Sequence, residues 1–435
     1  MNTIRRFSTF IQKKSPLVHL QTYMKPLIGN FGEYVLPLTF QKYNIKDVVL
    51  NTRIPKYATV FDVSHMGLFE LYITNKDRKI VPLDDSSNYL SYMLEKLFPL
   101  TLTNLKSNKS RLSVILNNKS YIIDDFIVSN IDNYKYRFII NANTKMLFRE
   151  YINIGLNKLY KYDVHLLNET NVNMKEVCKI ILAIQGKGSQ KLLEDIFNIN
   201  LNNIYFMENI TLNKNYRDTY YNYSGILFEN DIEISRCGYT GEDGFELYLN
   251  IKDGKLLYEK LMNMSNYDSY IQFGGLIERD ILRLEAGLCL SGNEFSENSL
   301  IHFNDTNLNF IIDKKRRMNK DFIGEMYIND KSPYIRCGFI SSKPIKTNEE
   351  IYTNYNNNYE KNIGFITSSG KSYNLNNQFI GMGYINKNIY KEHSINNNLT
   401  NNLYMLNNNR KTKLFITKLP FIKTNYYTKP KLNQN

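Results

Sequence analysis

Three acidic residues of the chain occupy positions where a carboxylate is costly. Asp124 and Asp125 lie in the apolar run 121–128, and Glu246 lies between two apolar residues. A carboxylate in such a strand costs free energy unless it meets a hydrogen-bond donor. Because neighbouring strand residues point to opposite faces, one of the two aspartates must face inward or into a cleft. All three acids are therefore candidates for ligand binding or proton transfer, with a charged hairpin edge as the alternative for the aspartates.

Glu246 belongs to a predicted hairpin. The runs 232–236 and 245–249 alternate with a period of two, which is typical of strands. Three glycines in the loop 238–244 permit positive φ and the close approach of a ligand. Two interpretations stay open: a Gly-rich turn with Glu246 on the solvent face of an edge strand, or a carboxylate that meets a donor in a binding site.

A helix predicted after the glycine pair at 274–275 carries two arginines. Arg279 and Arg283 lie one turn apart, beside the apolar face of the helix. They can pair with Glu278 and Glu285 of the same helix, or reach a ligand, since a guanidinium offers several donors in a fixed plane. The apolar face consists of Ile277, Ile281, Leu284 and Leu288.

Asp62, Ser64 and His65 are the residue types of a hydrolase triad. Residues 61–67 alternate as a strand, however, and neighbours on a strand point to opposite faces. Ser64 and His65 therefore cannot face each other as nucleophile and base. We interpret His65 as a structural histidine with a hydrogen-bond partner.

Composition limits the choice of partners. The 435 residues suffice for two or three domains, and no apolar run reaches the roughly 18 residues that span a bilayer, so no membrane span is expected. The net charge of +13 would suit nucleic acid, but the basic residues are scattered, so no nucleic-acid partner is expected. The tract 313–320 is the exception, interpreted as a solvated linker with a docking patch for an acidic protein as the alternative.

The four cysteines are far apart and form no CxxC pair, so the sequence predicts neither a zinc site nor a disulfide framework. Cys289 lies in an apolar stretch and is expected in the core. A position in the predicted hairpin allows Cys237 to be exposed, but the sequence places no base beside it to activate its thiol.

The N-terminal residues 1–14 are basic and contain no acid, and their apolar residues share one helical face. This make-up is typical of a mitochondrial presequence, so localisation in the mitochondrial matrix is expected, with a disordered basic tail as the alternative.

At the other end, short strands separated by polar turns predict a small β-barrel-like domain. Asn141 ends a predicted strand, where it can cap the helix that begins near Lys145.

Three segments together resemble one known family. They contain the hairpin and helix described above and the strand that ends at Gly67, and weaker similarity extends over nearly the whole chain. In this order they resemble the aminomethyltransferase family, the T-protein of the glycine cleavage system. The segments are Ala58–Gly67, Ser235–Leu247 and Glu278–Leu288.

The resemblance implies an α+β fold in a three-domain cloverleaf arrangement of the T-protein type, with a C-terminal β-barrel-like domain. Combined with the sequence pattern, it gives expected bounds for each part. These are a presequence at 1–14, a discontinuous folate-binding domain 1 at 15–65 and 165–300, a split βαβ-like domain 2 at 66–164, a basic linker at 301–325 and a β-rich domain 3 at 326–435.

The same resemblance implies the reaction. An aminomethyl group on lipoylated H-protein would pass its methylene carbon to tetrahydrofolate, giving 5,10-methylenetetrahydrofolate and ammonia, with no metal. The implied catalytic acid is Asp125. The implied substrate and folate contacts are Glu246, Arg279, Tyr239, Tyr426 and Asn141.

Leu112 and Ser129 stand where the family can place aromatic residues, and this departure concerns folate affinity more than reaction class. The alternative is therefore a catalytically weakened folate-binding homologue, for example one that acts in iron–sulfur cluster maintenance, although the Lys-Gly-Cys-Tyr motif of that family is missing. A folate-dependent demethylase with a flavin domain would need a G-x-G-x-x-G fingerprint, which the sequence lacks.

Overall fold

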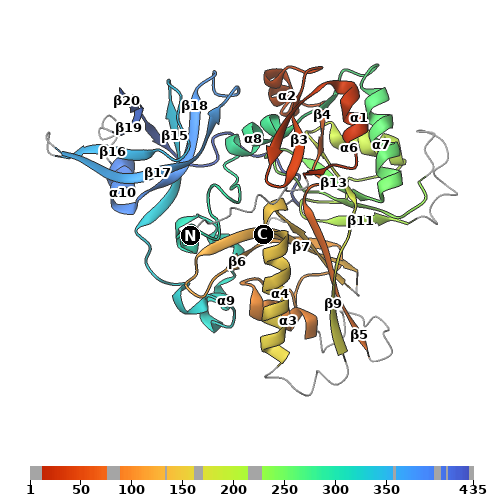
Figure 1. Ribbon diagram of the computed structural model, residues 1–435, viewed down its shortest axis with the longest axis horizontal. Helices are drawn as coiled ribbons and strands as arrows, with labels where there is room; N and C mark the ends of the chain where they lie inside the picture. The colour runs from red at the N-terminus through yellow and green to blue at the C-terminus, as the bar shows by residue number, and fades with distance from the viewer. Residues whose placement is uncertain are drawn as a thin grey trace, which may run out of the picture.

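The computed structural model consists of three lobes, and helix α8 (Leu276–Glu285) lies between the first and the third (Figure 1). Helix α8 packs against helix α2 and strand β3 of the first lobe and against strands β17 and β18 of the third. The structure describes residues 12–75, 89–132, 135–160, 170–213, 228–355, 359–395, 403–407 and 410–430. Most of the predicted presequence lies outside these residues.

The first lobe is built on a six-stranded sheet in the order β11-β12-β13-β10-β4-β14. Only β14 and β4 run parallel; the other neighbours are antiparallel. Helices α6 (Ser189–Phe197) and α7 (Ile251–Met264) pack on this sheet. The strands are β4 (Ala58–Asp62), β10 (Ile180–Gln185), β11 (Asn209–Leu212), β12 (Ile232–Ser235), β13 (Gly244–Leu249) and β14 (Ile271–Phe273).

The predicted hairpin is strands β12 and β13. Strand β13 lies between β12 and β10, and all six of its residues are buried. An inner strand with both faces covered has no solvent side, so the edge-strand interpretation of Glu246 is wrong. Of the three loop glycines only Gly241 has positive φ (77°), whereas a Cβ on Gly238 would lie 1.8 Å from the Gln185 side chain.

A three-stranded sheet, β1-β3-β2, covers one side of this lobe. Its strands are β1 (Lys13–Lys14), β2 (Pro26–Phe31) and β3 (Tyr34–Phe40), and the nearby helices are α1 (Val18–Gln21) and α2 (Ile45–Thr52). Gly275 lets α8 begin directly against β3, because a Cβ there would lie 2.5 Å from the carbonyl of Leu38.

The second lobe is an antiparallel five-stranded sheet in the order β6-β7-β8-β5-β9. Strands β8 and β9 both run antiparallel to β5, which lies between them, so β8, α4 and β9 form a split β-α-β unit. Its aromatic core includes Phe98, Phe126, Phe138 and Phe148. The elements are β5 (Gly67–Asn75), α3 (Tyr89–Leu97), β6 (Lys109–Leu116), β7 (Ile122–Asp132), β8 (Lys135–Ile140), α4 (Lys145–Tyr160) and β9 (Thr170–Glu176).

The segment after α8 packs tightly between the lobes. The short helix α9 (Lys314–Asn319) holds Arg316, which is buried and donates hydrogen bonds to the carbonyls of Glu95 and Phe98. Its guanidinium also pairs with Asp321. The interpretation of this tract as wholly solvated is therefore wrong at Arg316.

The third lobe is a curled antiparallel sheet in the order β20-β19-β16-β17-β18-β15-β21, seen in blue in Figure 1. Glycines and apolar residues fill its inner strands, as predicted for short strands in a small β-rich domain. Its elements are β15 (Tyr334–Ser341), β16 (Glu350–Tyr355), β17 (Tyr359–Lys371), β18 (Phe379–Asn386), α10 (Lys387–Ile395), β19 (Leu403–Asn407), β20 (Arg410–Lys413) and β21 (Phe415–Thr417).

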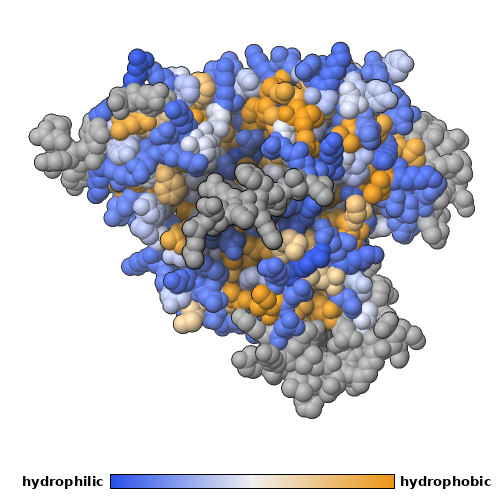
Figure 2. All heavy atoms as spheres, viewed as in Figure 1, coloured by the Kyte–Doolittle hydropathy of each residue, from blue (hydrophilic) through white to orange (hydrophobic). Residues whose placement is uncertain are grey.

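After β21 the chain returns to the first lobe as a strap, residues 418–430. Three backbone hydrogen bonds fix it: Ile422 to Glu285 (2.9 Å), Asn425 to Gly241 (2.8 Å) and Phe206 to Tyr427 (2.8 Å). The face in Figure 2 is largely hydrophilic, with separate hydrophobic patches on the upper and lower lobes. Among the described residues no helix has the length and apolar character to cross a membrane.

Candidate active site

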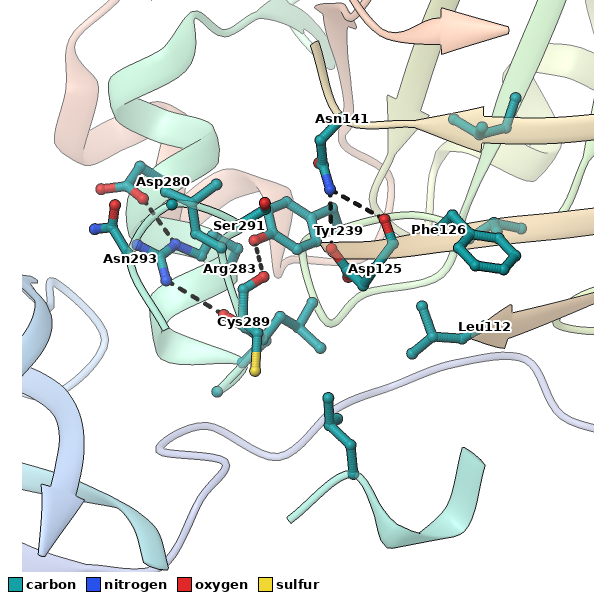
Figure 3. Close-up of a pocket in the computed structure, with 18 of the residues that line it drawn as sticks. Leu112, Asp125, Phe126, Asn141, Tyr239, Asp280, Arg283, Cys289, Ser291 and Asn293 are labelled. Carbon is teal, nitrogen blue, oxygen red and sulfur yellow. Dashed lines mark hydrogen bonds and ion pairs between the residues drawn. The ribbon is translucent and has the colours of Figure 1, made fainter. Parts of the chain in front are cut away.

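A cavity of about 1490 Å³ lies where the three lobes meet. Its walls come from strands β2, β6 and β7, from the hairpin β12–β13, from α8 and from the C-terminal strap. All six predicted site residues line this one cavity: Asp125, Asn141, Tyr239, Glu246, Arg279 and Tyr426. Figure 3 shows Asp125, Asn141 and Tyr239 converging from separate elements.

The two aspartates share one amide donor. Asn141 Nδ2 donates to Asp124 Oδ1 (2.8 Å) and to Asp125 Oδ1 (2.9 Å). Thr144 Oγ1 also donates to Asp124, which is fully buried, whereas Asp125 lines the cavity. A bulge in the β6–β7 pairing lies next to Asp124, and this departure from regular strand geometry accompanies the convergence of both carboxylates on Asn141.

The surroundings of Asp125 favour its neutral form. Burial raises its pKa to about 7, and the charge of Asp124 adds to the rise, while the hydrogen bond from Asn141 opposes it. Burial also raises the pKa of Asp124. A carboxyl group with a pKa near neutrality can both accept and release a proton at physiological pH.

Asn141 stands at the helix boundary, as the sequence indicated. It is the residue before the 3₁₀ turn Ala142–Thr144, which leads into α4, but its side chain makes no capping hydrogen bond. Its amide donates to Asp124 instead and, as Figure 3 shows, to Asp125. The Asn141 side chain therefore lines the cavity and does not cap the helix.

A residue of the same strand orients the Glu246 carboxylate. It is 7% exposed, and Tyr248 Oη donates to its Oε2 at 3.0 Å. The guanidinium of Arg137 lies 5.1 Å from the centre of the Tyr248 ring. Arg137 is paired in turn with Glu233 and Glu70. The sequence interpretation missed Tyr248, although its position two residues after Glu246 on the same strand face was a usable signal.

Arg279 has charge but few partners. It contacts Tyr239 face-on, with 5.1 Å from the guanidinium carbon to the ring centre, and Phe61 at 6.0 Å. Its Nη1 is buried and has no hydrogen-bond partner among the described residues. Burial lowers its pKa, and the nearby carboxylate of Glu246 raises it. The guanidinium therefore offers an unused donor at the wall of the cavity.

The ion pairs with Glu278 and Glu285, one of the two alternatives for the arginines of α8, do not form among the described residues. Glu278 accepts hydrogen bonds from Thr39 and from the backbone N–H of Gly275. Glu285 accepts from Arg53 Nε and Nη2, at 3.0 and 2.9 Å. Arg283 pairs with Asp280 and with the buried Glu294. The glutamates of the helix are thus occupied elsewhere, and Arg279 is left facing the cavity.

The two tyrosines contribute in different ways. Tyr239 donates its hydroxyl proton to the carbonyl of Cys289, so mainly its ring is left for contact with a ligand (Figure 3). Tyr426, on the strap, stacks on Phe206 with ring centres 4.2 Å apart. Burial raises the pKa of Tyr426 to about 12, so its hydroxyl stays protonated. Its neighbour Tyr427 covers Arg236 instead, with 3.9 Å from the guanidinium carbon to the ring centre.

Two sequence interpretations near the site are wrong. His65 makes no hydrogen bond within the described part of the chain, and its Nδ1 is buried without a partner. Cys237 is buried, at 3% exposure, and burial raises the pKa of its thiol well above the usual value. Cys289 is buried as expected.

In the described residues no group of three or more His, Cys, Asp or Glu side chains is arranged to hold a metal ion.

The family described as GCVT N-terminal domain matches residues 90–316, more than half of the chain. The chain belongs to the aminomethyltransferase family, the T-protein family of the glycine cleavage system. Members of this family are folate-dependent transferases, so the expectation of an enzyme is confirmed.

Relatives support this membership over nearly the whole length. The aminomethyltransferase of Thermosipho melanesiensis is 29% identical and covers 96% of this chain and 99% of its own. The mitochondrial aminomethyltransferases of Pisum sativum and Dictyostelium discoideum are each 29% identical, covering 91% and 95% of this chain and 86% and 93% of their own lengths. Mitochondrial and bacterial members of the aminomethyltransferase family are thus both similar to this chain.

The fold agrees with a solved member of the family. The crystal structure of glycine cleavage system aminomethyltransferase T from Bartonella henselae covers 96% of this chain and 100% of its own, with a TM-score of 0.74 and 25% identity. The predicted T-protein fold of mixed helices and sheets is confirmed. The C-terminal seven-stranded sheet of this chain curls as a half-barrel.

Proposed function

We propose that this aminomethyltransferase takes the methylene carbon of an aminomethyl group carried on lipoylated H-protein and transfers it to tetrahydrofolate, giving 5,10-methylenetetrahydrofolate, ammonia and the dihydrolipoyl arm of H-protein. One observation carries the proposal: Asp125, Glu246 and Arg279 come from three separate elements and line the same cavity. A carboxyl group with a pKa near 7, a buried carboxylate and an unused guanidinium donor are the groups that this transfer needs.

The residues present fit a reduced folate. Glu246 can accept two parallel hydrogen bonds from an amino-pyrimidinone edge, as carboxylates do from paired N–H donors. Arg279 Nη1 lacks a partner and can donate to a carbonyl oxygen. Tyr239 and Tyr426 supply aromatic walls for a flat ring. When bound, tetrahydrofolate would supply the N5 amine that attacks the methylene carbon.

Binding and orientation fall to Glu246, Arg279 and the two tyrosines in this proposal. Tyr248 holds the Glu246 carboxylate in one orientation, so little freedom is lost when a ligand docks. The Phe206–Tyr426 stack closes the strap side of the cavity with apolar area. Apolar walls limit the access of water, which would otherwise compete for the methylene carbon.

Proton transfer falls to Asp125. In its ionised form it accepts the proton that the folate amine releases as the new bond to carbon forms. Asn141 donates to the same carboxylate and so keeps it directed at the cavity. Asp124 remains a structural partner, because it is fully buried and bonded to Asn141 and Thr144.

The remaining expectations belong to the same proposal. Lipoylated H-protein is the proposed donor, the mitochondrial matrix the proposed location, and residues 1–14 the proposed presequence. The similarity to mitochondrial relatives supports the location. The domain bounds at 15–65 with 165–300, 66–164 and 326–435 are supported by the four sheets, each of which falls largely within one of these parts, and the linker at 301–325 belongs to the same proposal.

The test is a release assay with purified components. The protein is mixed with aminomethylated H-protein, and ammonia is measured with and without tetrahydrofolate. The proposal expects rapid release only when tetrahydrofolate is present, with 5,10-methylenetetrahydrofolate formed in equal amount. Equal release with and without tetrahydrofolate, by a protein that binds the folate, would contradict the transfer.

A further inference from the structure

His65 is buried in the wall of the cavity without a hydrogen bond. Its side chain is 5% exposed, and its Nδ1 is fully buried with no partner in the described part of the chain. The imidazole also lines the cavity that contains Glu246 and Arg279. A buried polar atom without a partner costs free energy, on the order of 1–3 kcal/mol. A buried polar atom that lacks a partner at a binding cavity points to a hydrogen-bond partner supplied by the ligand.

None of the described neighbours of His65 supplies the missing hydrogen bond. Phe31 and Tyr34 contact it through their rings, at 5.5 and 6.1 Å between ring centres. The Tyr34 hydroxyl accepts from Lys145 Nζ at 2.8 Å. The carboxylate of Asp62 accepts from Ser15, Gln21 and Ser64 and has no bond to His65.

Burial, together with nearby positive charges, keeps His65 neutral. Burial lowers its pKa to about 3, and the positive charges of Arg279 and Lys145 lower it further than burial alone. A neutral imidazole carries one N–H donor and one ring nitrogen acceptor. His65 can therefore form a hydrogen bond with a ligand without bringing a charge into the cavity.

We propose that His65 is a folate-binding residue, whose imidazole hydrogen-bonds the polar edge of the reduced pterin ring beside Arg279. This inference rests on the proposed function and adds a contact to it. In the free protein Nδ1 has no partner within the described part of the chain, and hydrogen bonding to the bound folate gives the imidazole a partner. His65 thus contributes to affinity for folate at the expense of the stability of the free protein.

The other substrate is a poorer match for this position. The aminomethyl group ends in an amine that is a cation when protonated. Arg279 and Lys145 make the surroundings of His65 positive, as their effect on its pKa shows. Like charges repel in a desolvated site, so the amine is disfavoured there, whereas a pterin carbonyl or ring nitrogen is not.

The chain contains a matched control. His302 is also buried, at 8% exposure, but both of its ring nitrogens are used. Nδ1 accepts from the backbone N–H of Asn304 at 3.2 Å, and Nε2 lies 3.0 Å from the carbonyl of Tyr327. His302 does not line the cavity. It is therefore a structural histidine of the kind that His65 was expected to be.

The experiment measures the dissociation constant of tetrahydrofolate by anaerobic calorimetric titration without H-protein, together with the melting temperature of each free variant. In His65→Phe the ring shape remains and the polar atoms are lost. We expect the dissociation constant to rise roughly threefold to tenfold, the worth of one hydrogen bond. We expect the melting temperature to stay or rise. His65→Gln should recover part of the affinity, and His65→Leu serves if Phe does not fold.

His302→Phe should show the reverse pattern, a lower melting temperature with an unchanged dissociation constant. An unchanged affinity in His65→Phe and His65→Leu, with wild-type protein that binds folate, would overturn this inference and leave the proposed function standing. A rise only in the KM for aminomethylated H-protein would assign His65 to the other substrate and overturn it too. Absence of tetrahydrofolate binding by the wild-type protein would overturn both proposals.

Discussion

The side-chain amide of Asn141 lies 2.9 Å from Asp125 Oδ1, and the same nitrogen lies 2.8 Å from Asp124 Oδ1. Two carboxylates thus share one donor in a buried site. Burial with so few donors raises the pKa of Asp125 to about 7. The relationship explains why Asp125, which lines the cavity, is the residue suited to moving a proton, and it leads to the first three predictions.

Replacing Asp125 by Asn should abolish most of the transfer. The variant keeps the size of the side chain but cannot accept a proton, and removing a general base typically costs 10²–10⁴-fold in rate. We expect folate-dependent ammonia release to fall at least about 100-fold, while tetrahydrofolate still binds. The exposed substitution Asp195→Asn on α6 is the control and should leave the rate unchanged. A rate within threefold of wild type would reject Asp125 as the base.

The rate should depend on pH through the same group. Because Asp125 acts in its ionised form, the rate of ammonia release is expected to rise with pH and level off above about 7. In Asp124→Asn the neighbouring charge is removed, so the pKa of Asp125 falls and the rise should shift to lower pH. The measurement is a pH profile of single-turnover ammonia release. A shift to higher pH in Asp124→Asn would contradict the assignment.

Stability should show the cost of this raised pKa. Between the ordinary aspartate pKa of 3.8 and about 7, the folded protein holds a proton on Asp125 that the unfolded chain has lost. The free energy of unfolding therefore falls as pH rises through this window, by up to about 1.4 kcal/mol per pH unit. Asp125→Asn should match wild type near pH 4 and exceed it at pH 8. Denaturant unfolding at both pH values tests this.

The strand pattern was enough to find the acids but not to orient them. The apolar run 121–128 and the alternating runs 232–236 and 245–249 predicted strands, and β7, β12 and β13 occupy these positions. The role of the Asn141 side chain could not be decided, because capping and pocket contact require the same residue type at the same boundary. Only the position of β7 beside β8 brings the aspartates within reach of its amide.

Tertiary packing explains the errors. The sequence left open whether the arginines of α8 pair with glutamates of the same helix, and it gave no sign that Arg53, at the C-terminal end of α2, occupies Glu285. His65 was expected to have a partner, but its neighbours are aromatic rings. Buried Cys237 shows the same limit, since its position in a hairpin loop gave no sign of how deeply that loop is buried. Each partner is far away in sequence, so local pattern carries no signal for it.

The carboxylate of Glu246 should be required for folate affinity. Glu246→Gln keeps the shape but replaces one acceptor by a donor, so we expect the dissociation constant of tetrahydrofolate to rise at least about tenfold. Tyr248→Phe removes the hydrogen bond that orients Glu246, and a smaller rise of roughly threefold is expected. Glu229→Gln, on the surface, is the control. Unchanged affinity in Glu246→Gln would place the pterin contact elsewhere.

Arg53 should hold the strap side of the cavity together. Its guanidinium bonds Glu242 (2.9 Å) and Glu285 (2.9 Å), and Glu242 also accepts two hydrogen bonds from Asn425, the residue before Tyr426. Arg53→Met would leave two buried carboxylates without their cation, and breaking such a pair costs about 3–5 kcal/mol.

We therefore expect Arg53→Met to lower the free energy of unfolding by that amount, measured by denaturant titration, and to weaken tetrahydrofolate binding because Tyr426 loses its fixed position. Arg53→Lys keeps the charge but not the planar fork, so its free energy of unfolding should lie between those of wild type and Arg53→Met. Lys191→Met removes an exposed pair with Asp195 and should change little. If Arg53→Met unfolds like wild type, the network does not anchor the strap, and Tyr426 is held by the backbone hydrogen bonds of the strap, by its stack on Phe206 and by the neighbouring Tyr427.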